Sequence, residues 1–310
     1  MDHPLRYQLL PNAPADQADV LVLPVAHAGE VCGASGTRAA PAAILEASGE
    51  LEYFEEDQAW SPMRHMKVAV LPELHASELE REEAFHGRIA TTAAALPRAS
   101  DDRLLVALGG DHSITPSLTA GCLGEPATIL FLDAHADLRP QYRGSEYSHA
   151  CPAHQLREQG HRIVMVGVRS MFEREAERIE SDDCIELYGD RALREASTRQ
   201  RLVARVESLT GPVWLSTDMD VFDPALVPGV GTPQPGGLDW HFAIDLLEAL
   251  LLRSKGRLCG MDLVELVPEP SRVSQLVAAK WMQKAISFWG KARGYDRAPE
   301  EGSQAGLEYE

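Results

Sequence analysis

Short apolar segments recur along the chain and alternate with longer segments of helical character. Each short segment is apolar nearly throughout, as expected for a β-strand that is covered on both faces. The longer segments carry mostly apolar stripes with polar residues interleaved, which is typical of helices packed on a sheet. The predicted strands are Val20–Val25, Val68–Leu71, Leu104–Leu108, Thr128–Leu132, Ile163–Val168, Val213–Ser216 and Leu258–Val264. The predicted helices include Pro41–Tyr53, Glu78–Leu96, Arg191–Leu209, His241–Leu252 and Ser274–Phe288.

This alternation predicts an α/β fold with a parallel sheet between two layers of helices. No linker-like change of composition interrupts it, so we expect a single domain over residues 1–295. After Trp289 the sequence becomes rich in Gly, Pro and Glu. Residues 296–310 are therefore predicted to form a disordered acidic tail.

The charge of the chain narrows the classes of partner. Its 310 residues include 29 Lys and Arg against 47 Asp and Glu, a formal net charge of −18. Phosphate backbones and anionic lipid would repel such a polyanion, so we expect neither a nucleic-acid nor a membrane partner, whereas a cationic substrate would be attracted. The sequence has no long apolar run and no leader-like N-terminus, and its five scattered cysteines form no C-x-x-C pair, which predicts a reducing, cytoplasmic location.

Chemically distinctive residues follow three of the predicted strands, those ending at Leu108, Leu132 and Ser216. In an open parallel sheet, ligands bind beyond the carboxyl ends of the strands, so these residues are candidates for a site. The six candidate side chains are His112 after the first strand, Asp133, His135 and Asp137 after the second, and Asp218 and Asp220 after the third.

The combination of these side chains points to bound metal. Alternate residues of an extended chain point to the same side, so Asp133, His135 and Asp137 can face one point. A single D-x-D or a single histidine is more often a solvated loop or a structural residue. Four carboxylates together at the mouth of an apolar sheet, however, cost several kcal/mol per ion unless a cation is bound. Two histidines and four aspartates suit two bridged cations, and imidazole with carboxylate favours manganese.

The three strings Gly-Gly-Asp-His-Ser, Asp-Ala-His-Ala-Asp and Ser-Thr-Asp-Met-Asp-Val-Phe-Asp-Pro resemble, in this order, the metal signatures of the ureohydrolases, the arginase and agmatinase family. Pro228–Gly237 looks like the proline- and glycine-rich loop of that family, and Gly260–Pro268 is similar to its last core strand. The resemblance extends from about Val20 to Phe288. It implies an arginase-like three-layer α-β-α sandwich whose mostly parallel sheet has about eight strands.

The resemblance also implies a ligand set and a reaction. Two manganese ions are implied, with His112, Asp133, Asp137 and Asp218 around one, His135 and Asp220 at the other, and Asp133 and Asp218 bridging the two. The implied reaction is attack of a hydroxide on a guanidinium carbon, which releases urea and a primary amine. Asp137 would relay the proton to the leaving amine.

Two further residues match catalytic or substrate-binding positions of the family. Glu265 matches the glutamate that binds the guanidinium, a planar cation that suits a carboxylate. His149 falls where the family places a proton-shuttling histidine. A surface salt bridge for Glu265 and a hydrogen-bonded loop role for His149 are the alternatives. Because family members form trimers or hexamers, we expect a homotrimer or homohexamer.

Four residues depart from the family pattern. Ala34 stands in place of an arginine and Ala40 in place of a glycine. Gln234 replaces the glutamate of agmatinase-like members, and Ser271 lies where the aspartate common in agmatinases is missing. These positions lie in or near loops that could shape the pocket, so they concern the substrate and leave the metal signatures intact.

The loop Arg139–His149 looks most like that of agmatinase-type members, and its Glu146 adds a carboxylate near the predicted pocket. Together with the net charge, it predicts a cationic guanidino-amine as substrate: agmatine first, aminopropylagmatine next. A carboxylate-bearing substrate (guanidinobutyrate, formimidoylglutamate or arginine), paired with Arg139 or Arg143, is the alternative. A catalytically silent binding or scaffold homologue is a further one, disfavoured because all six ligands are present.

Overall fold

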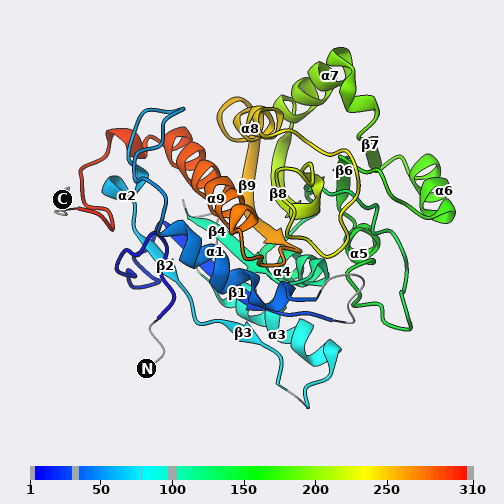
Figure 1. Cartoon of the computed structure of the whole chain (residues 1–310), viewed down its shortest axis with the longest axis horizontal. Helices are drawn as coiled ribbons and strands as arrows, with labels where there is room; N and C mark the ends of the chain where they lie inside the picture. Colours follow the sequence, from blue (N-terminus) through cyan, green and yellow to red (C-terminus); the bar gives the residue numbers. More distant parts are fainter. Residues whose placement is uncertain (1–3, 30–34, 78, 97–102, 306–310) are drawn as a thin grey trace.

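In the computed structural model, residues 4–29, 35–77, 79–96 and 103–305 are described, and their strands form one parallel sheet (Figure 1). The strand order is β2-β1-β4-β9-β8-β5-β6-β7, and the short β3 pairs with β1 beyond β2. The predicted parallel sheet is therefore confirmed. The strands are β1 (Val20–Ala26), β2 (Val68–Val70), β3 (Leu74–His75), β4 (Leu104–Gly109), β5 (Thr128–Leu132), β6 (Arg162–Val166), β7 (Ile185–Tyr188), β8 (Thr210–Asp218) and β9 (Lys255–Val264).

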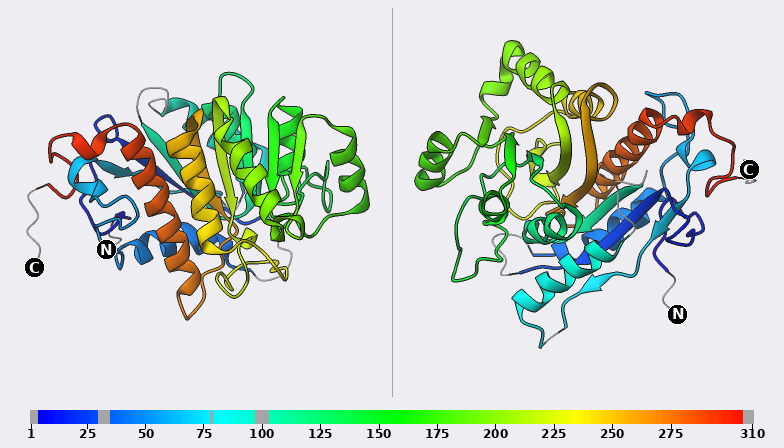
Figure 2. Two further views of the ribbon diagram at one scale, coloured as in Figure 1. Left: turned by 90° about the horizontal axis from the view of Figure 1, so that it is seen from above. Right: turned by 180° about the vertical axis from the view of Figure 1, so that it is seen from behind.

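Helices cover both faces of the sheet, which confirms the three-layer sandwich (Figure 2). Helices α1, α7, α8 and α9 pack on one face, and α3, α4 and α5 pack on the other. No helix of the described residues has both the length and the apolar character needed to cross a membrane. The helices are α1 (Ala40–Ser48), α2 (Pro62–His65), α3 (Glu82–Ala95), α4 (Thr115–Cys122), α5 (Pro152–Glu158), α6 (Glu173–Ser181), α7 (Ala196–Glu207), α8 (Trp240–Glu248) and α9 (Val273–Ala292).

The apolar strands supply both cores because neighbouring residues of a strand point to opposite faces. In β4, Leu104 and Val106 join the core under α1 and α9, whereas Leu105 and Ala107 join the core under α3 and α4. This double burial explains why the central strands are apolar nearly throughout.

The sequence pattern did not predict β7 and β3, which lie at the margins of the sheet. β7 is an edge strand whose second and third residues, Glu186 and Leu187, are partly or fully exposed, so it lacks a continuous apolar run. β3 has only two residues. The predicted helix Pro41–Tyr53 also ends early, at Ser48, because the next three amides donate to carbonyls three residues back and the chain continues as turns.

The predicted disordered tail is wrong for residues 296–305, which pack against α2 and the start of β2. The amides of Gly302, Ser303 and Gln304 donate hydrogen bonds of 2.7–2.9 Å to the carbonyls of residues 64, 66 and 63. The Ser303 hydroxyl accepts a hydrogen bond from the Val68 amide at 2.9 Å, and Gln304 is 1% exposed. Backbone pairing holds this segment although it offers few apolar side chains. Residues 306–310 of the predicted tail lie outside the described residues.

Candidate active site

The six candidate ligands converge beyond the carboxyl ends of β4, β5 and β8, which lie near one another in the sheet although they are distant in sequence. His112 forms the centre of a first group. Its Nδ1 atom lies 3.1 Å from Asp133 Oδ2, 3.3 Å from Asp218 Oδ2 and 3.6 Å from Asp137 Oδ2. Two carboxylates from the loop after β5 and one from the end of β8 therefore face one imidazole nitrogen.

His135 forms a second group beside the first. Its Nδ1 atom lies 2.9 Å from Asp220 Oδ2 and 3.6 Å from Asp133 Oδ1. Asp133 therefore directs one carboxylate oxygen to each group, as a ligand shared by two cations would. The structure brings all six predicted side chains together in this way.

A buried hydrogen-bond chain orients His112. Ser216 Oγ donates to Asp262 Oδ1 at 2.7 Å, and Trp214 Nε1 donates to the other oxygen of Asp262 at 2.5 Å. Because the proton of Ser216 is directed to Asp262, the serine oxygen accepts from His112 Nε2, 2.9 Å away. This assignment leaves Nδ1 of His112 to bind a proton or a metal ion.

The chain's own polar atoms leave this cluster unsatisfied. His112 Nδ1 and Asp133 Oδ2 are buried, and neither has a hydrogen-bond partner. Burial alone would lower the pKa of His112, but the adjacent Asp133 raises it to about 9. Burial, reinforced by Asp133, raises the pKa of Asp137, and burial with Asp220 raises that of Asp218. The cluster therefore favours added positive charge, and its imidazole and carboxylate donors fit divalent metal ions.

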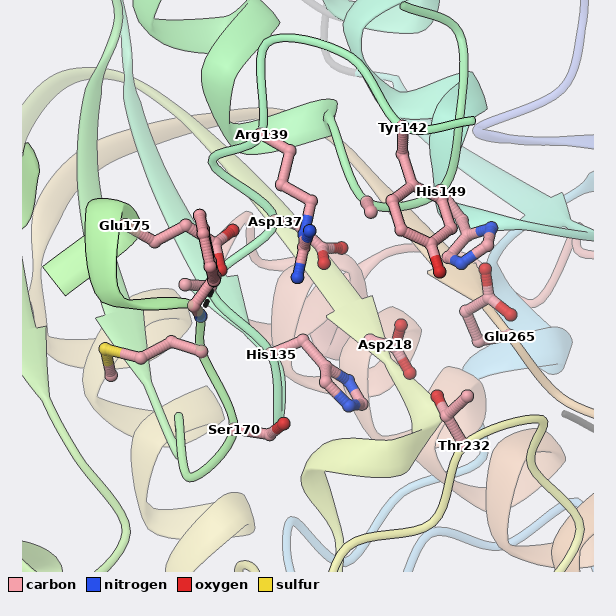
Figure 3. A pocket seen from close by; sticks show the side chains of 14 residues that line it. His135, Asp137, Arg139, Tyr142, His149, Ser170, Glu175, Asp218, Thr232 and Glu265 are labelled. Atoms are coloured by element: carbon pink, nitrogen blue, oxygen red, sulfur yellow. Dashed lines mark hydrogen bonds between the residues drawn. The ribbon is translucent and has the colours of Figure 1, made fainter. Parts of the chain in front are cut away.

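The cluster forms one wall of a pocket that also contains the predicted substrate residues (Figure 3). Glu265 and His149 both line it, together with His135, Asp137 and Asp218. Glu265 Oε1 accepts a hydrogen bond from the His112 amide at 2.8 Å, which joins the guanidinium-binding candidate to the metal-ligand loop. Burial, followed by the charge of Asp111, raises the pKa of Glu265 to about 8. Burial lowers the pKa of His149.

Two of the pocket's acidic residues have left-handed backbones. The φ angles of Asp137 and Glu265 are 49° and 64°, a region that costs a residue other than glycine about 1–3 kcal/mol. The prediction that Asp133, His135 and Asp137 share one side of an extended strand is therefore wrong in its geometry. β5 ends at Leu132 and the chain turns at Asp137, which still brings its carboxylate to His112.

The pocket also holds residues whose position the sequence did not indicate. Glu175, near the start of α6, is buried and accepts hydrogen bonds from the amides of Leu138 (2.8 Å) and Phe172 (2.6 Å). Arg139 lies between the rings of Tyr142 and Phe172, with its guanidinium carbon 5.1 and 5.0 Å from their centroids. Only Arg139 of this set was a candidate, because the others belong to ordinary polar or aromatic patterns.

Other residues of the predicted specificity loops lie elsewhere. Glu146 lines a neighbouring hollow with Glu82 and Glu83. Gln234 contributes its backbone carbonyl to a hydrogen bond with Arg169, and Ala40 is buried at the start of α1. Ser271 is exposed, and its amide donates to Glu269. Ala34 lies outside the described residues.

Comparison with known proteins places the chain in a family. The model of the Arginase family matches residues 18–287. The chain is 37% identical to an N(1)-aminopropylagmatine ureohydrolase of Thermus thermophilus over 92% of this chain and 94% of that one. It is 34% identical to an agmatinase of Pyrococcus horikoshii, covering 83% and 86%. The crystal structure of agmatine ureohydrolase of Thermoplasma volcanium matches the fold with a TM-score of 0.80 at 24% identity, covering 94% and 97%. The chain belongs to the arginase family.

Proposed function

We propose that the chain is a binuclear manganese hydrolase that cleaves the guanidino group of a cationic guanidino-amine, agmatine or aminopropylagmatine, to urea and a primary amine. One observation carries the proposal: Asp133 joins two His/Asp groups, and the loop of one of them is hydrogen-bonded to Glu265 in the same pocket. Membership of the arginase family and the names of the relatives support it.

The roles follow from the positions of the donors. His112, Asp133, Asp137 and Asp218 would hold one ion, and His135 and Asp220, with Asp133 and Asp218 shared, would hold the other. When bound, two such ions lower the pKa of a water molecule enough to supply hydroxide at neutral pH.

The remaining steps belong to side chains of the pocket. Glu265 would bind the guanidinium through paired charge-assisted hydrogen bonds, which orient its carbon toward the metal side of the pocket. Asp137 would accept the proton of the attacking water and pass it to the leaving amine nitrogen as the C–N bond breaks. His149 has a lowered pKa, so it is neutral near pH 7 and can take up a proton during turnover.

The charge of the pocket bears on the substrate class. Of the acidic residues that line it, Glu175 and Glu265 lie outside the proposed ligand set, and they favour a cationic substrate as the net charge of −18 does. Arg139 lines the same pocket and favours the second candidate, a carboxylate-bearing substrate such as guanidinobutyrate, formimidoylglutamate or arginine. The rings of Tyr142 and Phe172 already stabilise the Arg139 guanidinium by cation–π contacts, so this cation has interaction partners in the absence of a substrate carboxylate.

A substrate panel separates these functions. Urea release, or formamide release for the formimino compound, is measured at equal concentrations of agmatine, aminopropylagmatine, guanidinobutyrate, arginine and formimidoylglutamate. We expect a clear preference for one of the first two, and a preference for a carboxylate-bearing compound would contradict the proposed substrate. The absence of turnover on every compound by manganese-loaded protein would favour the silent binding homologue.

Two arginine variants sharpen the panel. A cationic guanidino-amine offers Arg139 no carboxylate. If such a compound is the substrate, Arg139→Gln should change its turnover by no more than about threefold. Arg143→Gln is the matched control, because Arg143 also lies over the Tyr142 ring, at 5.4 Å, but outside the pocket lining. A selective loss on carboxylate-bearing compounds in Arg139→Gln alone would support the second candidate.

We further propose a homotrimer or homohexamer in the cytoplasm, as the family resemblance and the cysteine usage predict. Light scattering at micromolar concentration tests the assembly, and a stable monomer would contradict it.

A further inference from the structure

Arg169, in the loop after β6, binds the backbone of three separate segments. Its five N–H groups make six contacts with five carbonyl oxygens, because the two N–H groups of Nη2 are shared among three of these oxygens. The rigid fork of N–H donors in an arginine suits such a set of acceptors, and a lysine ammonium does not reproduce it. The acceptors are Gly167 (3.2 Å), Asp220 (2.7 Å), Val221 (3.4 Å), Phe222 (3.3 Å) and Gln234 (3.3 Å from Nε and 3.2 Å from Nη2).

The backbone beside Arg169 also holds the loop that carries His135. The amides of Arg169 and Ser170 both donate to the Ala134 carbonyl, at 2.8 and 3.0 Å. The Ala134 amide in turn donates to Asp220 Oδ1 at 3.0 Å. Asp220 is thus fixed at its carbonyl by Arg169 and at one carboxylate oxygen by Ala134, and its free oxygen, Oδ2, lies 2.9 Å from His135 Nδ1.

The other half of the cluster is held differently. His112 is oriented by Ser216 and Asp262, and the hydrogen bonds of Arg169 end on neither of these residues nor on Asp218. The turn held by Arg169 meets that half through the Asp220 amide, which donates to Asp218 Oδ1 at 2.8 Å, so removal of the guanidinium should loosen the His135/Asp220 half more than the His112 half.

We propose that Arg169 is a positioning residue for the His135/Asp220 half of the metal centre. This inference rests on the proposed function, because it requires that two ions bind. Without the guanidinium, the turn at residues 219–222 loses three of its hydrogen bonds, and Asp220 Oδ2 is no longer held at His135. The affinity for the second ion should fall by about 10- to 100-fold, the usual effect of removing a residue that orients a metal ligand.

Calorimetric titration of the metal-free protein with Mn²⁺ tests this proposal. In Arg169→Gln we expect one of the two binding steps to shift 10-fold or more, while the other stays within about threefold of wild type. Arg169→Lys keeps the charge but lacks the fork, so it should shift in the same direction. Arg162→Gln is the matched control, since Arg162 begins β6, the strand that precedes the Arg169 loop, and its guanidinium bonds Asp183 and Cys184, away from the site.

Several results would overturn the proposal. These are unchanged binding in Arg169→Gln, equal weakening of both steps, or full restoration by lysine, which would assign the effect to charge.

If wild type itself binds fewer than two ions, the proposed function fails, and hydrogen exchange still tests Arg169. The Ala134 amide should then exchange faster in the lysine variant than in wild type, whereas the Ser113 amide, bonded to Asp111, should not change. Equal protection of Ala134 would overturn the proposal.

Discussion

His112 Nδ1 lies 3.1 Å from Asp133 Oδ2, and both atoms are buried without a hydrogen-bond partner. Leaving a buried polar group unpaired costs about 1–3 kcal/mol, so a folded chain rarely keeps two of them side by side without a ligand. The other oxygen of Asp133 accepts from the His135 amide at 2.6 Å. One carboxylate therefore connects both halves of the cluster, which makes it the most informative position for testing metal binding.

We predict that Asp133→Asn abolishes nearly all urea release and lowers the metal content. An amide has one oxygen for coordination and no charge, so it cannot serve two ions. Elemental analysis after manganese loading should find two ions per wild-type chain and one or none in the variant. Asp223→Asn is the control, because Asp223 is an exposed aspartate of the third signature whose side chain accepts from the nearby Ala225 amide. One ion or none in wild type would contradict a binuclear site.

Glu265→Gln should raise KM for the guanidino substrate by about 10- to 150-fold, which corresponds to losing 1.5–3 kcal/mol from charged hydrogen bonds. Glutamine can still accept from the His112 amide, so the metal content should stay at the wild-type value. Steady-state kinetics and elemental analysis on the same preparation check both parts. An unchanged KM would remove Glu265 from the substrate contacts, and a loss of metal would assign it a structural role.

The metal-ligand residues of the site were predictable because they lie in short contiguous stretches of sequence. The three signatures each follow an apolar strand, so strand prediction located His112, Asp133 and Asp218 at one end of the sheet. The contacts that orient them were not predictable in this way. Ser216 contacts Asp262 because β8 pairs with β9 in the sheet. Arg169 contacts the carbonyl of Gln234, which belongs to a different loop. The fold was predictable where burial made strands apolar throughout.

Lys284 on α9 is a buried cation that the sequence pattern did not single out. Its side chain is 1% exposed and pairs with Glu55, which is 0% exposed, and with Asp57 and Glu56. Lys284→Met should lower the free energy of unfolding by about 3–5 kcal/mol, because the buried carboxylate of Glu55 would lose its cationic partner. Denaturant unfolding measures this change.

The control for Lys284 lies one turn away on the same helix. Lys280 pairs with Glu56 at 2.9 Å, but its side chain is 25% exposed and that of Glu56 is 55% exposed. Lys280→Met should therefore change stability by no more than about 1 kcal/mol. Equal stability of the two variants would show that burial of the Lys284–Glu55 pair adds nothing.

Deleting residues 301–310 should destabilise the fold by about 2–5 kcal/mol, since the segment makes four hydrogen bonds to α2, Met66 and Val68, each worth roughly 1 kcal/mol. Deleting only residues 306–310 keeps these bonds and should change the melting temperature little.

Gly302→Ala tests the same packing with a single substitution, because an added Cβ would lie 2.4 Å from the Met63 carbonyl oxygen. It should reproduce part of the loss by forcing the segment away. Activity at low temperature should persist in both deletions, since the segment packs at β2, which three strands separate from β8 in the sheet order. If the longer deletion melts at the same temperature as the full-length chain, the packing of residues 301–305 contributes nothing to stability.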